Sequence, residues 1–246
     1  MLSLGIDLAA QPKATAICLL NWEAGGPRIE DLRSGIEDSE LVDLILSADK
    51  VGLDAPLGWP EHFVSTIQRH HLSSTGEKLP ERRMLTLRET DRRLQEATGR
   101  RPLSVSTDLI GVVALRAIGL QDELASRGSP VDRTGRGRVC EVYPAAALEA
   151  WGMGARGYKG PKSRQRLPEI TQGLIEGIGG LDFEAADRSG LESDHNQLDA
   201  FICALIARAV AKGKSTGPPE EWNELASREG WIHVPETDLR SLRTIA

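Results

Sequence analysis

The sequence predicts an α/β fold built on a mixed five-stranded sheet, with a helical insertion and a C-terminal extension. Three consecutive segments near the start are rich in β-forming residues and are separated by turns such as Gln11-Pro12 and Gly25-Gly26-Pro27. A short amphipathic segment follows, and then a fourth β-type segment. The phrase Gly-x-Asp ends the first of these strands as Gly5-Ile6-Asp7 and the fourth as Gly52-Leu53-Asp54. These features predict a βββαβαβα order of elements.

The first strands are residues 2–9, 14–21 and 28–36. Connections this short favour an antiparallel meander. Asp38 or Ser39 can cap the helix that follows. The next strand, residues 50–55, comes after a right-handed crossover and should therefore lie parallel to the first strand.

The rest of the chain alternates between helical and strand patterns. Residues 57–135, approximately, predict a helical insertion within a single domain that spans 1–246. Its helices are expected at 61–72, 86–98 and 107–127. The strand at 138–143 is followed by helices at 145–151, 163–178 and 194–212, a small helix at 219–227 and a strand-like piece at 230–234. The helix at 194–212 has the clearest buried stripe, which includes Leu198, Ile202 and Leu205.

Composition excludes several classes of protein. The 246 residues are 40% hydrophobic and 27% charged, as in ordinary globular proteins. The sequence has no run of eighteen apolar residues, so no membrane span is expected. The N-terminus begins directly in a strand pattern, and no signal peptide is expected. The three cysteines are far apart in apolar surroundings, which predicts buried reduced thiols. We therefore expect a cytoplasmic protein.

Charge is distributed unevenly along the chain. The net charge is −6, yet residues 78–166 contain 18 Lys and Arg against 10 Asp and Glu. The remainder contains 12 against 26. Such asymmetry can mark a local anion-binding surface, although a solvated face of exposed helices explains it equally well.

The two Gly-x-Asp phrases place one acid at the end of each of two strands. In an extended strand Gly5 and Asp7 share a face, and so do Gly52 and Asp54. If the two strands are neighbours, the carboxylates repel unless one keeps a proton or a cation lies between them. We favour the cation.

Two further acids are candidates for the same site. Asp199 lies inside the apolar helix 194–212, where an acid that faces the sheet is costly without a partner. Glu141 lies on the strand at 138–143. A set of carboxylate ligands without a cysteine cluster suits Mg²⁺ or Mn²⁺ rather than zinc. His195, four residues before Asp199 on the same helix face, is a candidate general base or water-orienting group.

Basic residues supply candidates for substrate binding. Arg88 forms either a surface ion pair with Asp91 or an arm that reaches the metal site from the insertion. The glycine-containing stretch 150–168 has a cluster of basic residues. This stretch could follow a phosphate backbone or form a flexible solvated loop. The substrate-binding candidates are Arg88, Arg138, Lys159, Lys162 and Arg164.

Several phrases carry a resemblance to a known family. They are Gly5-Ile6-Asp7-Leu8-Ala9, Leu53-Asp54-Ala55-Pro56-Leu57-Gly58, Arg88-Glu89-Thr90-Asp91-Arg92, Glu141-Val142-Tyr143-Pro144, Tyr158-Lys159, Asp199-Ala200 and Glu229-Gly230-Trp231-Ile232. In these the chain resembles the family called domain of unknown function 429, regarded as predicted ribonuclease H-like nucleases. The resemblance implies a ribonuclease H-like fold. Holliday-junction resolvases of that superfamily have a similar closing helix, and here Asn196 stands where their earlier acid would fall.

The leading functional hypothesis is a metal-dependent nuclease or phosphodiesterase that hydrolyses a nucleic-acid phosphodiester with two metal ions. Its partner would be DNA or RNA, and junction cleavage would require a homodimer. One alternative is an actin-like sugar kinase or ATPase, which begins with a similar strand-borne Asp. The other is a nucleic-acid-binding module that keeps the fold without catalysis.

Overall fold

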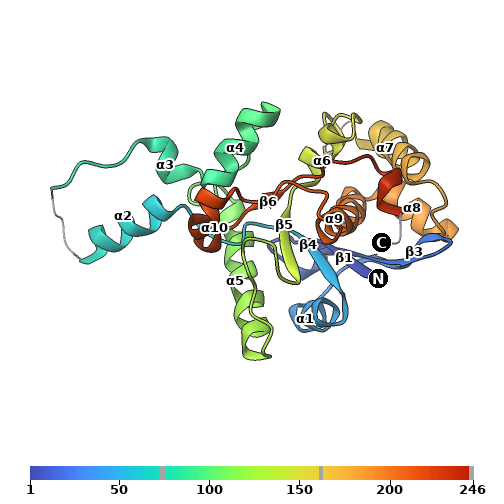
Figure 1. Cartoon of the computed structure of the whole chain (residues 1–246), viewed down its shortest axis with the longest axis horizontal. Coiled ribbons are helices and arrows are strands. Elements are labelled where there is room, and N and C mark those ends of the chain that lie inside the picture. The colour runs from blue at the N-terminus through green and yellow to red at the C-terminus, as the bar shows by residue number, and fades with distance from the viewer. Residues whose placement is uncertain (73–75, 161–162, 244–246) are drawn as a thin grey trace.

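The chain folds around one mixed sheet with helices on both faces, as shown in Figure 1. The computed structural model describes residues 1–72, 76–160 and 163–243. The strand order is β3-β2-β1-β4-β5-β6. The strands are β1 (Leu2–Asp7), β2 (Ala16–Glu23), β3 (Gly26–Ser34), β4 (Lys50–Asp54), β5 (Val139–Val142) and β6 (Ile232–His233).

The pairing of the first four strands follows the expectation from connection lengths. β1 and β2 are antiparallel, and so are β2 and β3. The helix α1 (Asp38–Ser47) then returns the chain, so that β4 pairs parallel with β1. β5 continues this parallel half beside β4.

The sheet has six strands and not the five that the sequence predicts. The strand-like piece near Trp231 forms β6, which pairs parallel with β5 at the edge of the sheet. It is only two residues long, so its sequence has no readable alternation, and its backbone partners decide its conformation.

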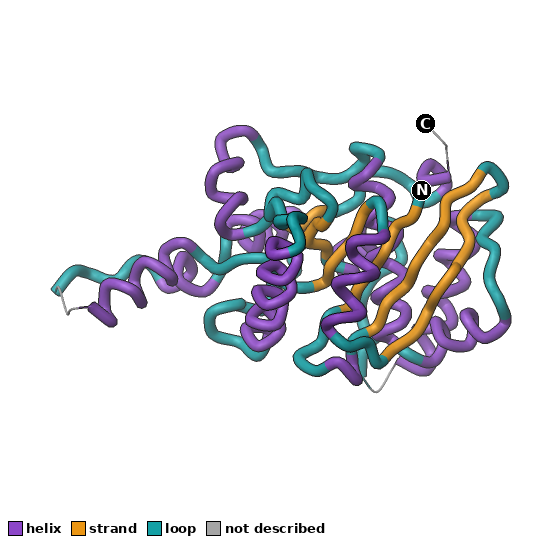
Figure 2. Tube along the Cα trace, turned by 90° about the horizontal axis from the view of Figure 1, so that it is seen from below, coloured by secondary structure: helices purple, strands orange, loops and turns teal. Residues whose placement is uncertain are grey.

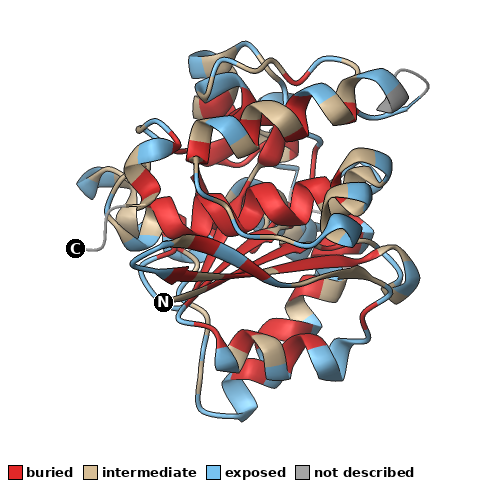
Figure 3. Cartoon of the chain, turned by 90° about the vertical axis from the view of Figure 1, so that its right-hand side faces the viewer, coloured by how far each residue is buried: buried red, intermediate tan, exposed pale blue. Residues whose placement is uncertain are grey.

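The two faces of the sheet are buried against different helices. Leu4 and Ile6 point into a core that includes residues of α1 and of α5 (Ile110–Ser126). The other face packs against α9 (His195–Ala211), in which every residue from Leu198 to Ala209 is buried. Three further helices pack around α9: α6 (Pro144–Ala150), α7 (Ser163–Ile178) and α8 (Ala185–Ser193). Figure 3 shows the resulting arrangement, with buried residues concentrated in the sheet and in the helices that cover it.

In the described part of the segment between β4 and β5, where an insertion was expected, the chain forms four helices. They are α2 (Glu61–Leu72), α3 (Arg82–Thr86), α4 (Glu89–Thr98) and α5 (Ile110–Ser126). The helix expected at 86–98 corresponds to α4 and begins three residues later than predicted, because Leu87 and Arg88 are extended. α3 precedes it and has no counterpart in the sequence prediction. α2 and α3 project away from the sheet as an arm (Figure 2).

The remaining helices follow β5 and were largely expected. They are α6 (Pro144–Ala150), α7 (Ser163–Ile178), α8 (Ala185–Ser193), α9 (His195–Ala211) and α10 (Asn223–Glu229), with 3-10 turns at Pro12–Ala14, Glu220–Trp222 and Arg240–Arg243. Among the described α-helices after β5, α8 has no counterpart in the sequence prediction. None of the described helices has both the length and the apolar character needed to cross a membrane.

Candidate functional site

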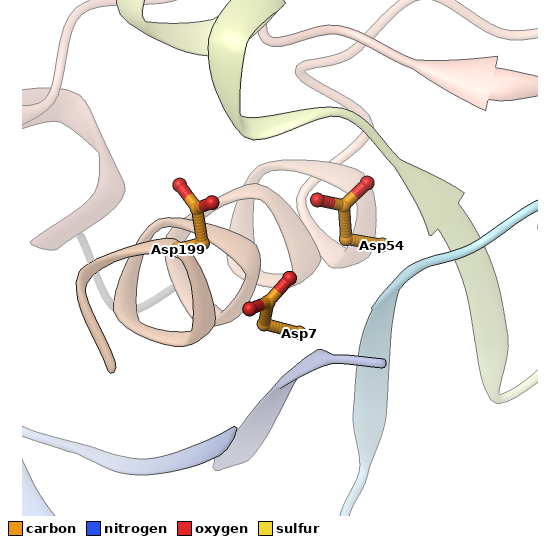
Figure 4. A group of neighbouring side chains, drawn as sticks. All are labelled: Asp7, Asp54 and Asp199. Atoms are coloured by element: carbon orange, nitrogen blue, oxygen red, sulfur yellow. The ribbon is translucent and has the colours of Figure 1, made fainter. Parts of the chain in front are cut away.

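Three aspartates from separate elements converge at one end of the sheet. Asp7 ends β1, Asp54 ends β4, and Asp199 lies in the second turn of α9. One carboxylate oxygen from each lies within 4.8 Å of the other two. Figure 4 shows the three side chains as neighbours, with Asp7 and Asp54 coming from the strands and Asp199 from the helix. We call these residues the aspartate triad.

The local sequence explains this convergence. In the parallel pairing of β1 and β4, Gly5 is opposite Gly52 and Asp7 is opposite Asp54. A Cβ at Gly5 would lie 1.9 Å from the Ala200 carbonyl oxygen, and a Cβ at Gly52 would lie 2.4 Å from that of Cys203. The glycines therefore let the backbone of α9 rest directly on the two strands. Each aspartate comes two residues after its glycine and therefore lies on the same face of the strand. Both aspartates thus face α9, two residues beyond the close contact at the glycine.

Burial and mutual repulsion oppose ionisation of the aspartate triad. The pKa of Asp54 is raised from 3.8 to about 7, mainly by burial and also by the charges of Asp199 and Glu141, while Lys159 opposes the rise. Burial likewise raises the pKa of Asp7 well above its ordinary value, and Asp199 and Asp54 add to this. The pKa of Asp199 is also raised by burial. Three carboxylates in this position require compensating positive charge.

Lys159 supplies part of that charge. Its ammonium nitrogen lies 2.5 Å from Oδ2 of Asp199, which is fully buried. The hydroxyl of Tyr158 donates a hydrogen bond of 2.9 Å to the other oxygen, Oδ1. Both carboxylate oxygens of Asp199 are thus contacted by consecutive residues of the loop between α6 and α7. The Asp-Ala phrase in α9 and the Tyr-Lys phrase in this loop are therefore parts of one structure.

Glu141, expected to join the acids, lies in a different buried cluster. Arg88 donates two hydrogen bonds to the Glu141 carboxylate, from Nη1 to Oε2 at 2.7 Å and from Nη2 to Oε1 at 2.6 Å. The backbone NH of Leu57 also donates to Oε2. The sequence predicts Glu141 as a metal ligand. In the structure, however, its carboxylate lies apart from the aspartate triad, and both of its oxygens are already bonded to Arg88. Its charge still contributes to the raised pKa of Asp54.

The expected ion pair between Arg88 and Asp91 is present, but it is buried and does not lie at the surface. Only 2% of the Arg88 side chain is exposed, and Arg88 forms a buried ion pair with Asp91 as well as with Glu141. Arg88 also donates to the carbonyl of Glu229 at the end of α10. The Arg-Glu-Thr-Asp phrase thus fixes α4 to the sheet.

The other candidates take varied positions. His195 is the first residue of α9 and is half-buried, and among the described residues it makes no hydrogen bond to the aspartate triad. Arg138 is exposed just before β5, at the end of the parallel strands opposite Asp54, and donates to the carbonyl of Ala48. Lys162 lies outside the described residues, and Arg164 lies in α7 with a side chain outside the described part.

Sequence reasoning missed two residues that position the site and its surroundings. Tyr158 was noted only as part of a motif, although a lone aromatic residue in a glycine- and lysine-rich loop was a usable signal for a buried anchor. Glu229 is buried, and its carboxylate accepts the first backbone NH groups of α2 and α4, from Glu61 and Glu89, each at 2.7 Å. No local pattern predicts such a double cap.

Comparison with known proteins adds one match. A family model described as protein of unknown function (DUF429) matches residues 5–223. This range includes every member of the aspartate triad together with Tyr158 and Lys159. No curated protein and no solved structure matches the chain.

Proposed function

The chain belongs to the DUF429 family, and we propose that it is a metal-dependent nuclease or phosphodiesterase of the ribonuclease H-like type. The observation that carries the proposal is the convergence of Asp7, Asp54 and Asp199 within 4.8 Å at the ends of two parallel strands and on the helix that covers them. Isolated carboxylates in such a position lower stability, so their presence together favours a functional role.

The sheet supports the fold assignment. Its first five strands have the order β3-β2-β1-β4-β5, with an antiparallel meander followed by parallel strands. This arrangement agrees with the βββαβαβα order on which the ribonuclease H-like assignment rests. β6 extends that core at one edge, beyond β5 and two strands away from β4, which carries Asp54.

The donor set fits a hard divalent cation such as Mg²⁺ or Mn²⁺. All three ligand atoms are carboxylate oxygens, which these ions prefer. Opposite ligands on one Mg²⁺ are about 4.2 Å apart, twice an Mg–O distance of about 2.1 Å. The observed 4.8 Å spread is therefore close to the spacing of a single site, and small side-chain movements would close it. A bound divalent ion would supply water activation and stabilisation of the leaving oxygen.

The residues around the aspartate triad have distinct tasks in this proposal. Asp7 and Asp54 come from paired strands, so the sheet fixes their separation. Tyr158 fixes the rotation of the Asp199 carboxylate through its hydrogen bond to Oδ1. Glu141 holds the loop after β4 in place through the NH of Leu57. The half-exposed Lys159 lies where a phosphate would approach.

The test combines metal binding with cleavage. Calorimetric titration with Mn²⁺ should show binding to the wild-type protein that is lost in Asp7→Asn and Asp54→Asn. The exposed Asp122→Asn on α5 is a matched control that should bind normally. Cleavage should be assayed on single strands, duplexes and four-way junctions of DNA and of RNA.

Each negative result points to a specific alternative. Absence of Mn²⁺ and Mg²⁺ binding would refute the metal centre. Nucleic-acid affinity that survives both aspartate substitutions, without cleavage, would indicate a binding module. Stabilisation by ATP would indicate an actin-like kinase.

A further inference from the structure

Lys159 is paired with one of the carboxylates that a metal ion would also require. Its ammonium is 2.5 Å from Oδ2 of Asp199, one of the oxygens of the carboxylate assigned to metal binding. Burial lowers the pKa of Lys159, but the charges of Asp199, Asp54 and Asp7 outweigh burial and raise it. In this structure the ammonium is thus the counter-ion of Asp199, and Asp54 and Asp7 attract it as well.

The Lys159 side chain can move from Asp199 toward solvent. Asp199 is fully buried, whereas 49% of the Lys159 side chain is exposed. Its ammonium lies over the Tyr158 ring, 5.5 Å from the ring centroid. Rotation about the side-chain bonds would therefore move the charge outward without opening the core.

The backbone of the loop is also suited to rearrangement. Gly152, Gly154, Gly157 and Gly160 all have positive φ, between 62° and 83°. Glycine adopts positive φ without steric cost, and the backbone of a glycine-rich segment has few preferred conformations. By contrast, Tyr158 is 3% exposed and bonded to Asp199, so it anchors the loop while its neighbour can move.

We propose that Lys159 is a displaceable counter-ion: it pairs with Asp199 in the metal-free protein and leaves this carboxylate when a divalent cation binds. This inference rests on the proposed metal site. A divalent ion ligated by Asp199 and an ammonium on the same carboxylate would repel one another at contact distance. The displaced ammonium then lies at the exposed mouth of the site, where a substrate phosphate would arrive.

The experiment compares Mn²⁺ affinity in variants of this one position. Lys159→Met removes the charge and keeps an unbranched side chain. Lys159→Arg keeps the charge, and Arg156→Met removes an exposed charge from the same loop as the matched control. Each variant is titrated calorimetrically with Mn²⁺, and its thermal unfolding is recorded in EDTA and in Mn²⁺.

Competition predicts a specific pattern. Lys159→Met should bind Mn²⁺ at least about tenfold more tightly, because the metal no longer displaces a charge-assisted contact. It should also unfold at a lower temperature than wild type in EDTA and regain stability with Mn²⁺. Arg156→Met and Lys159→Arg should both bind as wild type does.

Two outcomes overturn the inference, and they are distinguishable. Normal Mn²⁺ binding by wild type with equal or weaker binding by Lys159→Met refutes the counter-ion role and leaves the proposed function intact. Absence of Mn²⁺ binding in every variant refutes both.

A second measurement needs no variant. Acetylation of lysine amines, followed residue by residue by mass spectrometry, should be several-fold faster at Lys159 in Mg²⁺ than in EDTA. The exposed Lys13 and Lys78 serve as internal references. An acetylation rate at Lys159 that Mg²⁺ leaves unchanged would overturn the displacement.

Discussion

Replacing Asp54 by asparagine should stabilise the metal-free protein at alkaline pH while abolishing metal binding. The substitution removes one of three converging negative charges and keeps the size of the side chain. In the folded protein the pKa of Asp54 is about 7, compared with an ordinary value of 3.8. Because one pKa unit corresponds to 1.36 kcal/mol, ionised Asp54 costs up to about 4 kcal/mol in the folded state.

The sign of the pH dependence follows from proton binding. Between pH 3.8 and about 7 the folded protein holds a proton on Asp54 that the unfolded chain has already lost. Stability from this group is therefore fully present below the unfolded pKa and is lost as the pH rises through about 7. Asparagine cannot ionise, so the variant should avoid this loss.

Urea unfolding in EDTA at a series of pH values measures the effect. At pH 8 we expect Asp54→Asn to exceed wild type by about 2–4 kcal/mol, and the difference should shrink steadily toward pH 4. The exposed Asp122→Asn should differ from wild type by less than about 0.5 kcal/mol throughout. A destabilised Asp54→Asn at pH 8, or a difference that does not vary with pH, would refute the electrostatic account of the aspartate triad.

Three further substitutions test the packing around the site. Gly5→Ala should cost about 3 kcal/mol or more, because the new Cβ would meet the Ala200 carbonyl oxygen at 1.9 Å, whereas Gly119→Ala on α5, with nothing within 4 Å, should be neutral or stabilising in the same urea assay. Arg88→Met should cost about 3–5 kcal/mol in urea unfolding, because two buried carboxylates lose their partner; unchanged stability would contradict this. Glu229→Ala should accelerate hydrogen exchange at the first turns of α2 and α4 while leaving β1 protected, and uniform acceleration would contradict its role as a double cap.

Local sequence patterns predicted the three aspartates of the site, and the reason is geometric. Strand periodicity places Gly5 and Asp7 on one face, and the crossover through α1 makes β4 the parallel neighbour of β1. Repetition of the phrase at Asp54 then requires the two acids to meet. Asp199 was recognisable because an acid in a buried helix needs a partner.

The fate of Glu141 could not be predicted in the same way. Its partner Arg88 is 53 residues away in the chain, beyond the reach of any periodicity. An arginine three residues before an aspartate is usually a surface pair, and here the packing of α4 against the sheet buries it. The short edge strand β6 was missed as a sheet member for a related reason, because its conformation depends on β5.

The double cap at Glu229 has a consequence for the order in which the protein acquires its structure. Its carboxylate meets backbone groups that precede it by 168 and 140 residues. At translation rates of about 5–20 residues per second, Glu229 is synthesised roughly 8–34 s after the first residue of α2. Throughout that interval the N-termini of α2 and α4 lack this cap, so these two helices can reach their final stability only after Glu229 has been synthesised.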